Sequence, residues 1–272
     1  MPRVKPEDEA KQNFLSGKKA FDSGNSEQAI KDLISALHYY SKSDDHAVLA
    51  ELYRMLGELF YDQGKMIESR NYYKRAFQSF KSFNHKIGMA DCYDKIAISF
   101  MLQSELEHAE DYQEKAVDIR RNTPDKRGLA RGLKNLAIIK YKLGVDYKKA
   151  LEILEHALSL ASKSKEPQLV INISLDKAKV EIKLDLIEEA MKSHMIARKF
   201  SKKYSLKLPE DSEDDFVNLL IQLGLNAYDK GDMELSLKYL KNASLILKTN
   251  EKEVSSAVEA IISKLEEKYG KK

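Results

Sequence analysis

The sequence predicts an all-α fold that is built from stacked helix hairpins. Small residues recur in sets of four with spacings of 7, 5 and 7 residues, as in Gly17, Gly24, Ala29 and Ala36. The last small residue of each set falls at positions 36, 76, 116, 157, 197 and 243, a period of 40 or 41 that a spacing of 46 breaks once. A fixed period of this length indicates repeated supersecondary units.

Each set lies in two helical stretches separated by a Gly or polar turn, so each unit is expected to be a helix hairpin. Helix axes usually pack about 8–10 Å apart, and Gly or Ala opposite Ala or Ser lets two backbones approach closely. The turn Gly suits a left-handed conformation just past a helix end. An ordinary helical bundle is the alternative, and the common register of six sets argues against it.

Six hairpins and their flanks account for most of the chain. Residues 1–5 are expected to be a disordered N-terminus, and the polar stretch "KLPEDSEDD" (207–215) is expected to be a loop that explains the long spacing. Within a repeat region of residues 6–249, we place the hairpins at 6–43, 45–83, 86–122, 125–163, 167–204 and 212–248.

One further helix is expected at residues 251–269. Val254, Val258, Ile261 and Leu265 form an apolar stripe at helical spacing on an otherwise polar segment. A repeat array must cover its last apolar face, so we interpret this segment as a C-terminal capping helix. A partner-binding helix is the alternative.

Composition limits the classes of function. The net charge is +3, from 46 basic and 43 acidic residues, which gives no bulk electrostatic case for nucleic acid. Cys92 is the single cysteine, so an intrachain disulfide is impossible and a cytoplasmic location is favoured. No run approaches 18 apolar residues, so no membrane span is expected.

The sequence contains no recognisable catalytic or metal-binding pattern. It lacks a G-x-x-x-x-G-K loop, an H-E-x-x-H pair and a Cys pair. No histidine lies three or four residues from another histidine or from the cysteine. We therefore expect no enzyme activity, no cofactor and no metal, although an active site assembled in space remains an alternative.

Three segments carry a family resemblance. L-G-E-L-F-Y-D-Q-G (Leu56–Gly64), followed by Ser69 and Ala76, and G-K-K-A-F-D-S-G-N-S-E-Q-A-I (Gly17–Ile30) resemble the tetratricopeptide repeat (TPR). The stretch Lys126–Gly144 resembles the forty-residue subclass found in kinesin light chains. The resemblance implies a right-handed α-solenoid whose concave groove is lined by the first helix of each hairpin. It also implies protein binding without catalysis, by analogy of fold.

The fifth unit departs from this pattern. Lys177 and Glu181 stand where the family has large apolar residues, which leaves the register of this unit open by one residue.

The resemblance places side chains of the first helices in the groove. Asn135 stands where the subclass commonly holds a peptide backbone, since an amide both donates and accepts hydrogen bonds. The basic residues could instead be ordinary solvated side chains, and the tyrosines could serve packing within a repeat. The candidate groove residues are Arg54, Tyr61, Lys95, Arg131, Lys134, Asn135, Tyr141, Lys142 and Lys183.

The leading hypothesis is a scaffold or adaptor that binds a protein or peptide partner, with an acidic segment as one option. The alternative is an adaptor for membrane-fusion machinery that resembles SNAP proteins and binds through edge or convex surfaces. RNA binding by helical repeats is a third class, and near-neutral charge without a repeating basic and aromatic face argues against it. The oligomeric state is left open.

Overall fold

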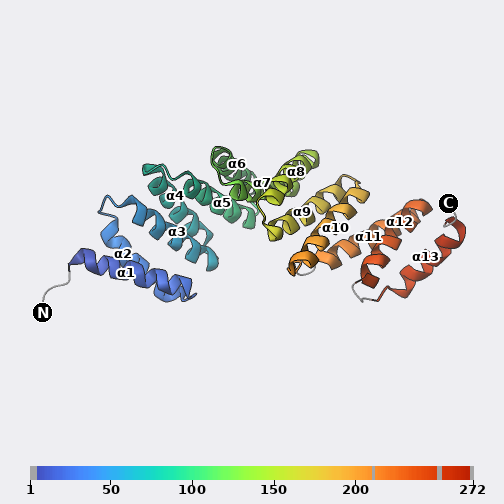
Figure 1. The fold of residues 1–272 in the computed structure, drawn as a ribbon, viewed down its shortest axis with the longest axis horizontal. Helices are drawn as coiled ribbons and strands as arrows, with labels where there is room; N and C mark the ends of the chain where they lie inside the picture. Colours follow the sequence, from blue (N-terminus) through green and yellow to red (C-terminus); the bar gives the residue numbers. More distant parts are fainter. Residues whose placement is uncertain (1–4, 210–211, 250–252, 270–272) are drawn as a thin grey trace. The chain divides into compact units, whose positions relative to one another are not determined.

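A computed structural model describes residues 5–209, 212–249 and 253–269. The expected disordered N-terminus lies outside these ranges except for Lys5, as do two residues of the polar insert at 207–215. The described residues contain helices, turns and loops but no strand, so the predicted all-α fold of helix hairpins is confirmed (Figure 1).

Thirteen helices occur in the described ranges, and they form six hairpins and a final helix (Figure 1). In chain order they are α1 (Pro6–Asp22), α2 (Ser26–Tyr40), α3 (His46–Asp62), α4 (Met66–Ser82), α5 (Lys86–Leu102), α6 (Leu106–Arg121), α7 (Lys126–Leu143), α8 (Tyr147–Lys163), α9 (Pro167–Lys183), α10 (Ile187–Tyr204), α11 (Ser212–Asp229), α12 (Met233–Thr249) and α13 (Ser256–Tyr269).

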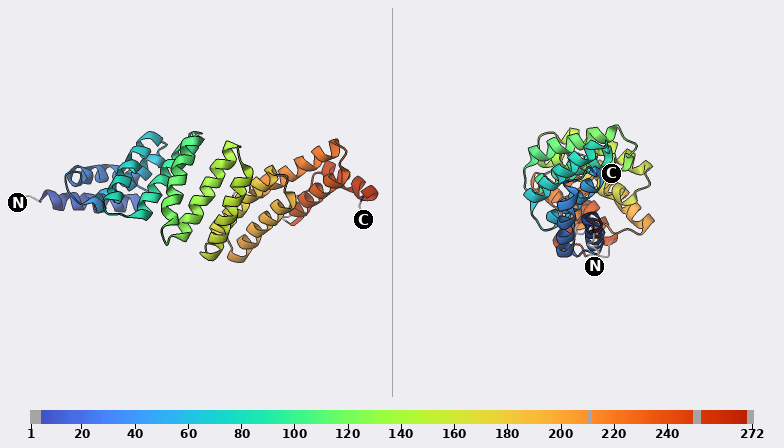
Figure 2. Two further views of the ribbon diagram at one scale, coloured as in Figure 1. Left: turned by 90° about the horizontal axis from the view of Figure 1, so that it is seen from above. Right: turned by 90° about the vertical axis from the view of Figure 1, so that its left-hand side faces the viewer.

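The chain divides into two compact units, Met1–Tyr204 and Ser205–Lys272. In the first unit, the first helix of each hairpin packs on the second helix of the hairpin before it, so five hairpins lie side by side in chain order (Figure 2). In the second unit, α11 and α12 form a hairpin and α13 packs against α12. Helix α13 begins at Ser256, directly after Ser255, and serine is a residue type favoured at this position.

The recurring small residues lie where helices approach closely. Ala36, Ala76 and Ala116 are completely buried, as the small-residue register predicts. A Cβ atom added to Gly57 would lie 3.1 Å from the ring of Tyr73 on the facing helix. Ser69 donates a hydrogen bond of 2.8 Å from its Oγ to the Gly57 carbonyl oxygen. Larger side chains at these positions would therefore separate the two helices.

The turn within each hairpin needs one residue in the left-handed region. Gly64 and Gly144 have φ of 74° and 73° at this position. Ser104 and Asp185 occupy the same place in their hairpins, with φ of 61° in each case. The turn geometry is therefore kept where the sequence does not supply glycine, at the expense of backbone strain.

The fifth hairpin replaces apolar packing with a buried ion pair. Lys177 Nζ lies 2.5 Å from Glu181 Oε1 on the same helix, and the Glu181 side chain is only 1% exposed. Lys177 Nζ also lies 3.4 Å from Ser193 Oγ on α10. The two residues that depart from the family pattern thus pair with each other inside the hairpin through Glu181 Oε1, while Glu181 Oε2 is buried without a hydrogen-bond partner among the described residues.

Candidate binding pocket on the first helices

A cavity of about 390 Å³ opens between the first helices of the second, third and fourth hairpins. Helices α3, α5 and α7 provide most of its wall, and α4 adds Tyr73. We call it the first-helix pocket, and its lining residues are Arg54, Glu58, Tyr73, Asp91, Asp94, Lys95, Ile98, Arg131 and Asn135.

Every basic residue of the first-helix pocket has a carboxylate nearby. Arg54 binds Glu51 through two hydrogen bonds of 2.6 and 2.9 Å, which hold the pKa of the Glu51 carboxyl below its usual range. Lys95 Nζ lies 2.5 Å from Glu58 Oε1. Arg131 has the longest contact of the three, 3.5 Å to a carboxylate on α5, and its side chain is 49% exposed. Of the three basic residues, Arg131 is therefore the one most available to a ligand.

A buried polar network lies behind this wall. The Arg120 side chain is fully buried, with Nη1 at 2.5 Å from Asp94 Oδ2 and Nη2 at 2.5 Å from Asp91 Oδ1. Gln113 donates a 2.6 Å hydrogen bond to Asp94. Burial raises the pKa of the Asp94 carboxyl, while the positive charge of Arg120 opposes that shift. Asp91 Oδ1 also faces Arg131, and Asp91 and Asp94 both line the pocket, so two carboxylates join the network to the pocket.

Two glycines at the start of α7 leave room for this network. A Cβ atom on Gly128 would lie 2.7 Å from Arg120 Nε and 1.9 Å from Asp125 Oδ2. A Cβ atom on Gly132 would lie 3.4 Å from Arg120 Nη1, which is a tight but tolerable contact. Asp125 precedes α7 and accepts a 2.7 Å hydrogen bond from the Gly128 amide at the helix start.

The structure brings four of the nine candidate groove residues into the first-helix pocket, and the other five lie elsewhere. Arg54, Lys95, Arg131 and Asn135 line it. Tyr61 is adjacent to the pocket, with Lys95 Nζ 5.7 Å from the centre of its ring. Lys134 Nζ lies 3.9 Å from Asp176 Oδ2, and the ring centres of Tyr141 and Tyr147 are 5.7 Å apart. Lys142 and Lys183 are exposed to solvent.

Sequence reasoning missed the ion pairs of the pocket. Asp91 and Arg131 are 40 residues apart, and Glu58 and Lys95 are 37 residues apart. Opposite charges separated by about one repeat length therefore provide a signal, because such residues face each other across adjacent first helices.

Two observations on the described residues concern metal binding and thiol chemistry. The described residues contain no group of three or more His, Cys, Asp or Glu side chains that could hold a metal ion. Cys92 is buried, and burial raises the pKa of its thiol, which disfavours the nucleophilic thiolate. In the same ranges, no helix combines the length and apolar character that crossing a bilayer requires.

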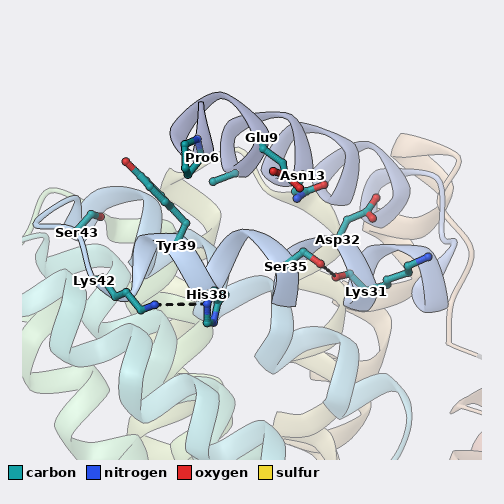
Figure 3. Close-up of a pocket in the computed structure, with 11 residues that line it drawn as sticks. Pro6, Glu9, Asn13, Lys31, Asp32, Ser35, His38, Tyr39, Lys42 and Ser43 are labelled. Carbon is teal, nitrogen blue, oxygen red and sulfur yellow. Dashed lines mark hydrogen bonds between the residues drawn. The ribbon is translucent and has the colours of Figure 1, made fainter. Parts of the chain in front are cut away.

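A larger and more polar cavity of about 890 Å³ lies between α1 and α2 (Figure 3). Its wall includes Glu9, Asn13, Lys31, His38 and Lys42, and the side chains of Lys42 and His38 approach to 3.4 Å. Its acidic and basic groups are mixed, and none of the candidate groove residues lies there.

Antiparallel hairpins stacked with a 40-residue period define a helical-repeat protein. Residues 89–163 match the family described as Tetratricopeptide repeat. This match agrees with the resemblance of the sequence to the tetratricopeptide repeat. Residues 2–123 also match the family described as Soluble NSF attachment protein, SNAP.

Relatives and solved structures agree with this fold. "Protein KINESIN LIGHT CHAIN-RELATED 3" of Arabidopsis thaliana is 25% identical over 157 residues, which are 56% of this chain. The match spans only 24% of that relative's length. The apo form of RapI has a TM-score of 0.69 at 20% identity, with 90% of this chain and 100% of that chain covered. Aspartyl phosphate phosphatase F from Bacillus subtilis has a TM-score of 0.64 at 19% identity, with 96% of this chain and 70% of that chain covered. These two structures show the fold alone.

Proposed function

We propose that the chain is a non-catalytic scaffold that binds an extended peptide segment of a partner protein in the first-helix pocket. The tetratricopeptide match and the kinesin light chain-related relative support a protein-interaction scaffold. The peptide site itself rests on the side chain of Asn135. This side chain is half-buried at the pocket wall and makes no hydrogen bond to another residue in the described part of the chain.

An amide in this position suits the backbone of an extended peptide. Its oxygen accepts from a peptide N–H and its nitrogen donates to a peptide C=O, so one side chain can satisfy both groups of a bound residue. The cavity of about 390 Å³ holds one or two side chains beside such a backbone. Recognition would then combine a backbone contact at Asn135 with side-chain contacts along α3 and α5.

Arg131 is the group that would bind an acidic residue of the segment. Arg54 and Lys95 are held by carboxylates at 2.5–2.9 Å, so a ligand carboxylate must compete with Glu51 or Glu58 for them. The longer contact between Arg131 and Asp91 leaves guanidinium donors for a second acceptor. We therefore expect one dominant acidic contact and a shallow dependence of affinity on salt.

The test starts from a partner that the full chain captures, which is then titrated against single variants. Asn135→Ala should weaken binding by about 1–3 kcal/mol, because it leaves polar groups of the peptide backbone unpaired. Arg131→Ala should weaken binding and reduce its salt dependence. Lys126→Ala, an exposed change on the same helix outside the pocket, is the matched control. Equal affinity in the wild type and all three variants would place the binding site elsewhere.

A second candidate function is a SNAP-like adaptor for membrane-fusion machinery. The match of residues 2–123 to the SNAP family favours it, since this range contains α1 to α6. Such an adaptor would bind through edge or convex surfaces of the first three hairpins. Binding that resists Asn135→Ala and Arg131→Ala but is lost on charge reversal at exposed residues of α2, α4 or α6 would support this candidate.

A further inference from the structure

A third cavity in the first unit combines aromatic and basic side chains. It has a volume of about 670 Å³ and is formed by α3, α4, α5 and α6. We call it the aromatic pocket, and its characteristic residues are Tyr53, Phe77, Tyr93, Tyr112, Lys74, Arg75 and Lys115. Among the described residues, no carboxylate lines it.

Three of the four aromatic rings of this pocket form a connected series. Phe77 stacks on Tyr93 with a centroid distance of 4.4 Å, and Tyr93 contacts Tyr112 at 5.6 Å. The hydroxyl groups of Tyr53, Tyr93 and Tyr112 make no hydrogen bond to any other residue that the structure describes, and all four rings are partly exposed. The pocket therefore presents ring surface together with free hydroxyl donors, the composition typical of binding hot spots.

The aromatic pocket lies on a different face of the array from the first-helix pocket. Tyr93 is two positions from both Asp91 and Lys95, which corresponds to a rotation of about 200° around α5. On α4, Tyr73 lines the first-helix pocket, whereas the next two residues, Lys74 and Arg75, point in other directions from the helix and line the aromatic pocket. The two pockets can thus be changed independently by mutation.

The charges of the two pockets also differ. Lys74 and Arg75 form no ion pair with a described residue, and the Arg75 guanidinium lies 5.8 Å from the centre of the Tyr53 ring. Lys115 contacts Asp111 at 2.6 Å, but both side chains are about half exposed, and such pairs contribute only about 0–1 kcal/mol. Three basic groups therefore surround the aromatic rings without an opposing carboxylate in the described wall.

We infer that the aromatic pocket binds an acidic segment of a second protein that packs an aromatic or large aliphatic side chain against the exposed surface of the rings. Its charge complements Lys74, Arg75 and Lys115, and a volume of about 670 Å³ accommodates one or two such side chains. This surface is separate from the peptide site proposed above, so the chain would connect two partners. A single-stranded nucleic acid is another anionic and aromatic ligand, and the experiment below separates it from a protein segment.

The experiment selects peptides from a displayed random library on the full chain, so the partner need not be identified first. We expect enrichment of peptides that combine Asp and Glu with Phe, Trp, Tyr or Leu. The most enriched peptide is then synthesised and titrated by fluorescence anisotropy against the wild type and against Lys74→Glu/Arg75→Glu, which changes two exposed residues and spares the fold. Its affinity should fall about tenfold or more in this variant.

Two control variants define the outcome. Lys81→Glu reverses an exposed charge on α4 outside the pocket and should leave the affinity nearly unchanged. Asn135→Ala should also leave it unchanged, which separates this inference from the first-helix site. Selection without acidic peptides, affinity that survives Lys74→Glu/Arg75→Glu, or equal loss with Lys81→Glu overturns the inference. Tighter binding of an oligothymidylate than of the selected peptide also overturns it.

Discussion

Arg120 and Asp94 form an ion pair between α6 and α5 in which the arginine side chain is fully buried and the aspartate side chain is 7% exposed. Gln113 completes the coordination of the carboxylate, and Asp91 binds the other end of the guanidinium. Four polar side chains of the third hairpin are therefore arranged behind the first-helix pocket, at the place where the fourth hairpin packs.

Removal of the buried guanidinium should be strongly destabilising. Arg120→Met leaves Asp94 buried without its cation, and breaking such a pair costs about 3–5 kcal/mol. Urea denaturation followed by circular dichroism measures the loss. Arg121→Met, at the neighbouring exposed residue, is the control and should change the free energy of unfolding by less than about 1 kcal/mol. Similar losses for the two variants would contradict the structural role of the buried arginine.

The two glycines of α7 should respond differently to the same substitution. Gly128→Ala places a methyl group against Asp125 and Arg120 and should lower the free energy of unfolding by about 1–3 kcal/mol. Gly132→Ala makes contacts at 3.4 Å or longer and gains the helix propensity of alanine, about 1 kcal/mol, so its net effect should be near zero or stabilising. Thermal and urea unfolding of both variants would show whether this order is correct.

The left-handed turn position predicts a pair of opposite effects. Gly64→Ala meets no neighbouring atom within 4 Å, so its cost of about 1–2 kcal/mol comes from the backbone conformation alone. Ser104→Gly relieves the same strain, but glycine also raises the conformational entropy of the unfolded chain. The net effect should be a stabilisation of about 0.5 kcal/mol. Melting temperatures that fall for both variants would refute this explanation.

His194 should make stability depend on pH. Burial, with a smaller contribution from Arg198, lowers the pKa of this histidine from 6.5 to about 4. The unfolded state then binds a proton that the folded state excludes, so stability is unaffected above pH 6.5 and decreases between pH 6.5 and 4. The slope from this residue is at most about 1.4 kcal/mol per pH unit. His194→Gln should reduce that slope when urea midpoints are compared at pH 7.5 and 5, whereas an unchanged slope would assign it to other groups.

Truncation after Thr249 tests the predicted capping role of α13. Val258 and Leu265 are buried in the second unit, and Lys241 pairs with Glu266 at 2.6 Å. Without α13, apolar surface of α12 would face water, and arrays that lose a terminal cap lose solubility or stability. Light scattering and thermal unfolding should therefore show self-association or a lower melting temperature. A truncated chain that remains monomeric and equally stable would show that α13 is not a cap.

The fold could be predicted because close helix contacts restrict the sequence directly. Ala76 and Ala116 cannot be larger without separating their hairpins, so the restriction recurs at every repeat and is visible in the spacing. Asp185 adopts the left-handed turn conformation in the fifth hairpin, which fixes the register that Lys177 and Glu181 left open. The backbone conformation of Asp185 thus identifies the turn of the fifth repeat, although its side chain is not the glycine found at this position in other repeats.

The site could be predicted only in part, because ion pairing depends on three-dimensional distance. Lys95 and Arg131 were recognisable as first-helix cations, but their pairing with Glu58 and Asp91 requires the spacing between neighbouring helices. Arg120 is the clearest example of this limit. In the sequence it adjoins Arg121 near a helix end and resembles a solvated residue, whereas in the structure its side chain is completely buried, next to Asp91 of α5 and Gly128 of α7.

The shared carboxylate of Asp91 has a consequence for the cost of binding. Arg120 and Arg131 both contact it, and Glu51 and Glu58 restrain the other two basic residues of the pocket. These side chains have already lost rotamer freedom when the protein folds, and ordering a flexible side chain at an interface costs about 0.5–1.5 kcal/mol. A ligand of this pocket would meet a wall that is rigid before it arrives, so its association would lose little side-chain entropy on the protein's side.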